Sequence, residues 1–112
     1  MNILLVDDDR DRLESLRDVL SAMKHDVVVA SSAEHAILAL FDGLFDAIVT
    51  DHDLGTAYGT ALLSSVAKFY PATRRMLFTA GDLPRPVNAH VAVEHMDDIG
   101  TFVRAVRTLF SP

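Results

Sequence analysis

The stretch that decides the fold is Ile3-Leu4-Leu5-Val6-Asp7-Asp8-Asp9, an apolar run that ends in three carboxylates. Such a run is too short for a buried helix and suits a strand that is covered on both faces. A second run, Phe45 to Thr50, is followed by Asp51. If the two strands are parallel neighbours, their acids meet at one edge of the sheet. Carboxylates gathered there repel one another and need a dication or protons.

Length and composition limit the class of protein. The chain has 112 residues, no cysteine and a formal net charge of −6, so we expect one domain over residues 1–112 without disulfides or cysteine-based zinc sites. Arg and Lys are scattered and form no basic face for nucleic acid. No apolar stretch reaches the roughly 18 residues of a membrane span, and no secretion signal pattern begins the chain, which predicts a cytoplasmic protein without membrane contact.

Strand-like and helix-like patterns alternate along the chain. Strands are predicted at Asn2–Val6, Asp26–Ala30, Phe45–Thr50, Arg75–Thr79 and His90–Glu94. Apolar residues at helical spacing predict helices over Asp9–Lys24, from Ser31 or Ser32 as cap to Gly43, around Leu62–Phe69, and over Asp97–Phe110. This alternation predicts a parallel sheet with helices on both faces. Ligands of such sheets sit beyond the carboxyl ends of the strands, where Asp7, Asp8, Asp51 and Thr79 are expected.

In the order of its strands, helices and acidic residues, the chain resembles the receiver domains of two-component response regulators (CheY-like proteins). Residues 3–9 resemble the first strand of that family with its acidic pair. Ala47-Ile48-Val49-Thr50-Asp51 resembles the strand that presents the phosphoacceptor aspartate, and Gly59 matches the glycine that follows the phosphoacceptor loop. Met76-Leu77-Phe78-Thr79-Ala80 resembles the strand that ends in a switch threonine or serine. The resemblance covers the whole chain.

The resemblance implies a flavodoxin-like α/β fold, a three-layer, doubly wound, five-stranded parallel sheet in the order 2-1-3-4-5. It implies that Asp7 and Asp8 hold Mg²⁺, and that Asp51 also coordinates the metal and accepts a phosphoryl group. The donor would be a sensor histidine kinase or a phosphotransfer protein. The backbone carbonyl of Asp53 would be a further metal ligand, and Thr79 would donate a hydrogen bond to a phosphoryl oxygen. Such a domain is a phosphoacceptor that signals to an output protein or domain, and at most catalyses its own phosphorylation and dephosphorylation.

Elementary chemistry agrees with these roles. A phosphoryl group that moves onto a carboxylate brings negative charge beside negative charge, and Mg²⁺ neutralises both with oxygen ligands. Little covalent chemistry is asked of the protein, which mainly positions and neutralises the reacting groups.

The chain departs from the family at the fifth strand. The family has a lysine at the end of this strand, whereas here Glu94 or His95 stands there and no lysine follows Lys68. A glutamate at that position would repel the phosphoryl group that the lysine would attract. The aromatic switch of the family falls at Val91 or Ala92, which have no ring. Gly55 replaces the usual proline after the phosphoacceptor.

The segment before the fifth strand is also short. Residues 80–93 contain Gly81, Pro84 and Pro86 and leave little room even for an average helix of about 11 residues. We therefore expect the fourth helix of the family to be missing or reduced to a turn. Without that neighbour, the last helix would leave apolar surface for a second copy of the chain, as in a homodimer.

Two other functions stay open. One is a degenerate pseudo-receiver that binds partners independently of phosphorylation. The other, more remote, is a phosphatase of the haloacid dehalogenase type, because Asp51-His52-Asp53 resembles the Asp-x-Asp signature of those enzymes. The chain lacks the downstream lysine and the length for the cap of such an enzyme.

Overall fold

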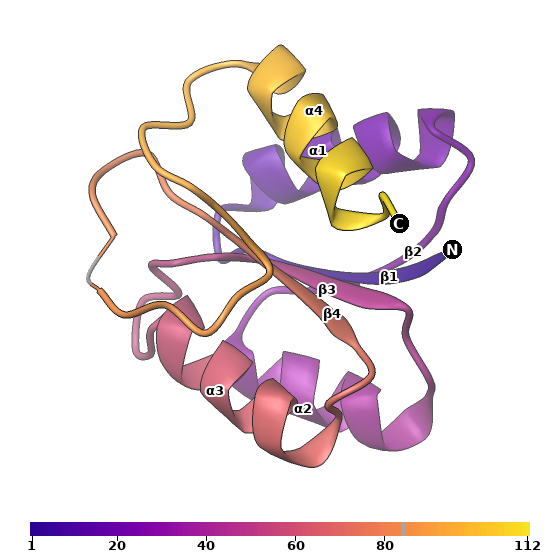
Figure 1. The fold of residues 1–112 in the computed structure, drawn as a ribbon, viewed down its shortest axis with the longest axis vertical. Coiled ribbons are helices and arrows are strands. Elements are labelled where there is room, and N and C mark those ends of the chain that lie inside the picture. The colour runs from indigo at the N-terminus through magenta and orange to yellow at the C-terminus, as the bar shows by residue number, and fades with distance from the viewer. Residues whose placement is uncertain (84) are drawn as a thin grey trace.

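The predicted alternation of strands and helices is confirmed in a computed structural model, which describes residues 1–83 and 85–112 (Figure 1). Five strands form one sheet in the order β2-β1-β3-β4-β5, and every neighbouring pair is parallel. The strands are β1 (Asn2–Val6), β2 (Asp26–Ala30), β3 (Ala47–Asp51), β4 (Arg74–Phe78) and β5 (Val91–Val93). The helices are α1 (Arg10–Ala22), α2 (Ala33–Asp42), α3 (Gly59–Phe69) and α4 (Ile99–Leu109). This is the flavodoxin-like, CheY-like order that the sequence predicts.

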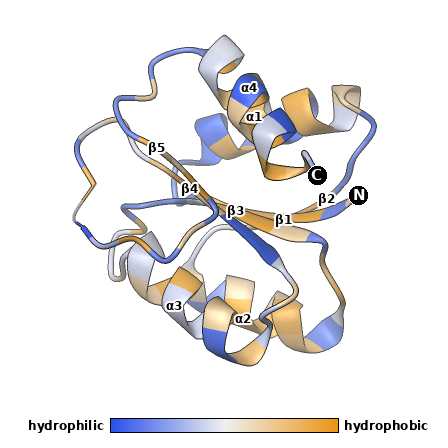
Figure 2. Ribbon diagram, in the orientation of Figure 1, coloured by the Kyte–Doolittle hydropathy of each residue, from blue (hydrophilic) through white to orange (hydrophobic). Residues whose placement is uncertain are grey.

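The sheet is the middle of three layers. In Figure 1, α1 and α4 cover one face of the sheet, and α2 and α3 cover the other. Successive residues of β1 serve opposite faces, since Leu5 belongs to the core under α1 and α4 whereas Leu4 belongs to the core over α2 and α3. Both residues are fully buried. This two-sided burial explains why the strands are continuous apolar runs, as the hydropathy colours of Figure 2 show.

Side-chain caps begin three of the helices. Asp9 accepts a hydrogen bond from the backbone N–H of Arg12, and Ser32 accepts one from that of His35. Asp98 does the same for Thr101, so α4 begins at Ile99, two residues later than expected. Each cap satisfies an N–H group that has no partner within its own helix.

The third strand extends one residue further than the sequence predicts. Asp51 is the last residue of β3 and is paired with Phe78 of β4. The backbone N–H of His52 then donates to the Phe78 carbonyl at 2.9 Å, which carries the ladder to the end of β4. The peptide group that follows Asp51 is therefore held against β4.

The expected loss of the fourth helix is confirmed within the described residues. Residues 79–83 and 85–90, which connect β4 to β5, contain no helix. Pro84, one of the residues on which the expectation rested, lies outside the described residues. β5 itself is shorter than the predicted His90–Glu94 and comprises Val91–Val93.

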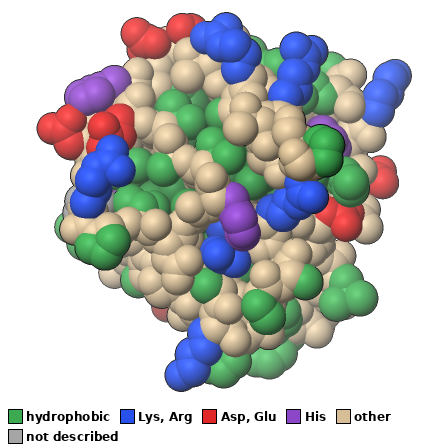
Figure 3. Space-filling model, viewed as in Figure 1, with side chains coloured by type: hydrophobic (Ala, Val, Ile, Leu, Met, Phe, Trp, Pro, Cys, Tyr) green, Lys and Arg blue, Asp and Glu red, His purple; other side chains and the backbone are tan. Residues whose placement is uncertain are grey.

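Exposed apolar side chains gather on the opposite layer from the last helix. Phe102 and Val106 of α4 are fully buried, although Ile99 is exposed. Over α2 and α3, the exposed apolar residues include Leu38, Phe41 and Phe69, in a region where Figure 3 shows hydrophobic side chains at the surface.

No helix in the described part of the chain is long and apolar enough to cross a membrane.

Candidate functional site at the carboxyl edge of the sheet

The strand register brings the predicted acids to one edge of the sheet. Val6 of β1 is paired with Thr50 of β3. Asp7 and Asp51 are the next residues of these two neighbouring chain segments. Asp51 is in turn paired with Phe78, and Thr79 is the next residue of that chain segment. A depression of about 470 Å³ opens at this edge. It is lined by Asp8, Asp9, Arg12, Asp51, Asp53, Thr79, Ala80 and Gly81.

Three carboxylates form a cluster with the composition of a magnesium site. Asp7, Asp8 and Asp51 each offer an oxygen atom, and these atoms lie within 4.8 Å of one another. Asp7 is fully buried, Asp51 is 5% exposed, and Asp8 is open to solvent. Hard oxygen donors with one exposed side suit Mg²⁺, which usually keeps several waters. The donor set therefore fits the metal that the resemblance implies.

Arg12 lies across the same carboxylates. Its Nε donates to Asp7 Oδ2 at 2.5 Å and its Nη2 donates to Asp7 Oδ1 at 2.9 Å, a two-pronged contact. The same Nη2 also lies 2.7 Å from Asp51 Oδ2. The guanidinium thus bridges the buried acid of β1 and the acid of β3, and offsets their mutual repulsion.

The electrostatics of Asp51 are those of a carboxyl group that is buried next to another acid. The pKa of Asp51 is raised from 3.8 to about 6. Burial is the main cause, and the negative charge of Asp7 is the second. Arg12 and the backbone N–H groups of His52 and Asp53 act in the opposite direction. The pKa of Arg12 is raised, chiefly by its hydrogen bond to Asp7. At neutral pH Asp51 is therefore ionised and close to its titration range.

Two glycines let the loop after β3 pass close to the acids. Gly55 has φ +79°, a left-handed conformation that explains why glycine rather than proline stands here. A side chain on Gly59 would put its Cβ 2.2 Å from the Asp51 carbonyl oxygen, and the Gly59 N–H donates to the His52 carbonyl at 2.6 Å. Asp53 is exposed, and its Oδ1 accepts the N–H of Gly55 at 3.0 Å.

Thr79 lies on the far wall of the depression from β1. Its side chain is buried, and its hydroxyl oxygen accepts the N–H of Gly81 at 3.3 Å. The hydroxyl hydrogen of Thr79 thus remains available to another acceptor in the depression.

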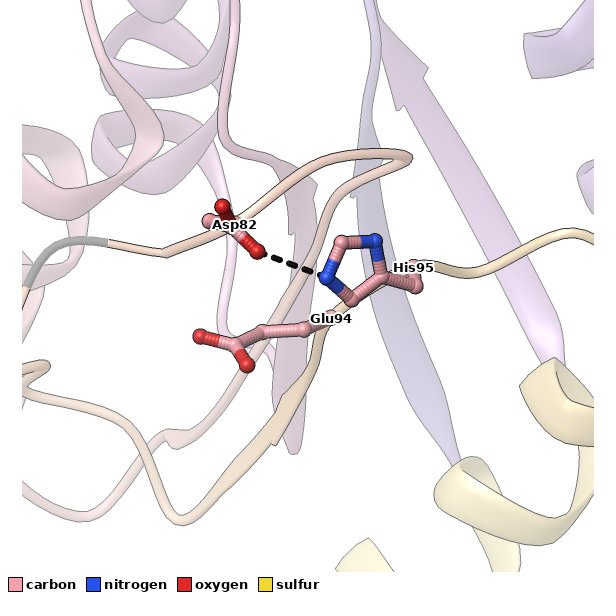
Figure 4. A group of neighbouring side chains, drawn as sticks. All are labelled: Asp82, Glu94 and His95. Carbon is pink, nitrogen blue, oxygen red and sulfur yellow. Dashed lines mark ion pairs between the residues drawn. The ribbon is translucent and has the colours of Figure 1, made fainter.

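Glu94 and His95 contact the segment before β5 rather than the acid cluster. The carboxylate of Glu94 accepts the backbone N–H of Leu83 at 3.0 Å and lies 3.7 Å from the guanidinium of Arg85. His95 faces Asp82, with 2.6 Å between its Nε2 and the carboxylate (Figure 4). Neither residue lines the depression. Both side chains instead contact described residues of the segment between β4 and β5.

Comparison with known proteins gives the family. Residues 3–100 match the response regulator receiver domain, so the chain belongs to this family. The response regulator protein FleR of Pseudomonas aeruginosa is 35% identical over 88 residues, which make up 78% of this chain and 19% of FleR. The chain thus spans about a fifth of the length of that relative.

Solved structures share the fold. TrrA of Thermotoga maritima, a response regulator crystallised with Mg²⁺-BeF, has a TM-score of 0.88 and 22% identity, and the match covers 97% of this chain and 98% of TrrA. A structure of TrrA with the histidine kinase ThkA has a TM-score of 0.85 and 23% identity, and its match covers 98% of both chains.

Sequence reasoning missed Arg12. The residue reads as part of the charged outer face of the first helix, because helical periodicity does not say which polar residues of the first turn face the sheet edge. A signal was nevertheless present. Buried acids need a compensating cation, and Arg12 stands only three residues after the acidic run Asp7–Asp9, in the first turn of the predicted helix.

Proposed function

We propose that this receiver domain accepts a phosphoryl group on Asp51 in a two-component phosphorelay and passes the signal on through protein contacts. The observation that carries the proposal is the meeting of Asp7, Asp8 and Asp51 within 4.8 Å at the carboxyl edge of the sheet. Asp51 is the acid that is both held in a strand and open to the depression.

The chemistry assigned to Asp51 is a displacement at phosphorus. An ionised carboxylate oxygen attacks the phosphorus of a phosphohistidine, a new O–P bond forms, and the P–N bond breaks with its electron pair on the imidazole nitrogen, which takes up a proton. A pKa of about 6 leaves Asp51 ionised, and thus nucleophilic, at neutral pH. Thr79, which lines the same depression as Asp51, would donate its hydroxyl hydrogen to an oxygen of the transferred group.

The metal assignment follows the donor set. Asp7, Asp8, Asp51 and the backbone carbonyl of Asp53 would hold Mg²⁺, which when bound supplies positive charge to the acceptor and to the phosphoryl oxygens. The donor would be a histidine kinase or phosphotransfer protein. Since the described residues contain no helix between β4 and β5, the output contact would involve another surface than the one that the fourth helix and the fifth strand form in the family.

The test is phosphoryl uptake from acetyl phosphate with Mg²⁺, followed by intact-protein mass spectrometry. We expect wild type to gain the mass of one phosphoryl group and Asp51→Asn to gain none. Asp53→Asn is the matched control, because it removes a neighbouring charge and keeps the backbone carbonyl. Uptake that survives in Asp51→Asn would contradict the assignment.

A second function is favoured by one observation. Asp7 and Asp51 are already paired with Arg12, and no lysine follows Lys68. Both features suit a receiver that binds partners without phosphorylation. This alternative predicts that neither Mg²⁺ nor beryllofluoride shifts the backbone amide resonances around Asp51.

A further inference from the structure

The position of Arg12 is set by the start of α1. Asp9 caps the helix by accepting the Arg12 N–H at 3.1 Å, which fixes residue 12 in the first turn above the edge of the sheet. The Arg12 side chain is 36% exposed, so its stem is half-covered while its head reaches into the acid cluster. The contact joins residues 39 positions apart in the chain and depends on the packing of α1.

The guanidinium uses the oxygens that a metal would need. Both oxygens of Asp7 accept hydrogen bonds from Arg12, and Asp51 Oδ2 accepts a third. Mg²⁺ binds carboxylate oxygens at about 2.0–2.1 Å with near-octahedral geometry. A guanidinium within hydrogen-bond distance of the same oxygens would place a second cation against the metal. The two cations therefore exclude one another from these positions.

No other cation in the described part of the chain forms a salt bridge with Asp7 or Asp51. Glu94 and His95, one of which is expected where the family has a lysine, contact Leu83, Arg85 and Asp82 and do not line the depression. The positive charge of the metal-free site is thus concentrated in Arg12.

We propose that Arg12 is an internal counter-ion of this acid site that Mg²⁺ must displace. The Arg12 contacts thereby set the Mg²⁺ concentration at which the site is filled. The inference rests on the proposed function, because it concerns the same carboxylates. In the metal-free protein Arg12 holds Asp7 and Asp51 together. When metal enters, the guanidinium leaves these oxygens and moves out to solvent, toward which its side chain is already partly exposed. Mg²⁺ affinity is lowered by the free energy of breaking the Arg12 contacts.

The experiment measures Mg²⁺ affinity by isothermal titration calorimetry in wild type, Arg12→Met and Arg10→Met. Arg12→Met keeps the length of the stem and removes the charge. Arg10→Met is the matched control, because Arg10 lies exposed in the same helical turn, has no salt bridge among the described residues, and changes the net charge equally. We expect Arg12→Met to bind Mg²⁺ about tenfold more tightly than Arg10→Met, as loss of a charged hydrogen-bonded competitor implies.

A second measurement is made on the wild-type protein, so it does not depend on whether a variant folds. The Nε–H resonance of Arg12 in wild type reports on its hydrogen bond to Asp7. We expect slow hydrogen exchange of this proton without metal and faster exchange, with a shifted resonance, at saturating Mg²⁺. Arg12→Lys keeps the charge but lacks the planar fork, so its affinity should fall between those of wild type and Arg12→Met.

The outcomes separate this inference from the proposed function. Mg²⁺ binding by all variants with equal affinity, or weaker binding by Arg12→Met, overturns the role of Arg12 and leaves the metal site standing. An Arg12 Nε–H that stays protected at saturating Mg²⁺ overturns it as well. Absence of Mg²⁺ binding in wild type and in every variant removes both proposals.

Discussion

Replacing Asp51 by asparagine should make folding stability less dependent on pH. In wild type, burial beside Asp7 raises the pKa of Asp51 from 3.8 to about 6, so the folded state holds this proton more tightly than the unfolded chain does. Below pH 4 the carboxyl group is protonated in both states and costs nothing. As the pH rises through 6, the folded state must bury a charge, and stability falls.

The size of the effect follows from the shift. A difference of about two pKa units corresponds to roughly 3 kcal/mol of unfolding free energy. Water in the open depression screens part of it, so we expect about 2–3 kcal/mol. Asp51→Asn has no proton to lose there. Relative to wild type, it should therefore gain this amount of stability between pH 4 and pH 8.

The assay is urea unfolding followed by circular dichroism from pH 4 to pH 8, in chelator and without divalent cations. All other ionisable groups are common to the two proteins, so the difference between the two curves reports on Asp51 and its interaction with Asp7 and Arg12. Asp18→Asn, a change at an exposed position of α1, is the control and should track wild type. Parallel curves for wild type and Asp51→Asn would refute the reasoning, as would a variant that loses stability relative to wild type on going to pH 8.

Three further substitutions test the framework of the site. Gly59→Ala should cost about 1–3 kcal/mol or more and weaken the Mg²⁺-induced amide shifts at Asp51, because its Cβ would meet the Asp51 carbonyl oxygen; Gly81→Ala, into open space, should leave urea stability within about 0.5 kcal/mol of wild type. Phe102→Ala should cost about 3–5 kcal/mol in urea unfolding, since the ring is fully buried edge-on against Phe78; a loss below about 1 kcal/mol would contradict this packing. Ser32→Ala removes the cap of α2 and should cost about 1 kcal/mol, whereas Ser32→Thr should retain most of it.

The order of elements could be predicted because it rests on local physics. Short, continuous apolar runs such as residues 3–6 are typical of strands that are covered on both faces. Helices between such strands are typical of crossover connections in a parallel sheet. Acids that follow β-like runs then fall at the carboxyl edge of a sheet. The meeting of Asp7 with Asp51 was therefore expected from the sequence, as was the lack of a helix in the described residues between β4 and β5.

The charge balance of the site was decided by tertiary structure alone. Whether Arg12 faces solvent or the acids depends on how α1 packs over the sheet edge, and helical spacing carries no information about that angle. The sequence likewise does not show that the Glu94 carboxylate accepts the backbone N–H of Leu83, a partner 11 residues away. Both outcomes depend on long-range contacts between side chains, which form only when separate segments are packed together. The sequence by itself thus determined where the acids stand, and the packing of α1 and of the segment before β5 decided which charges compensate them.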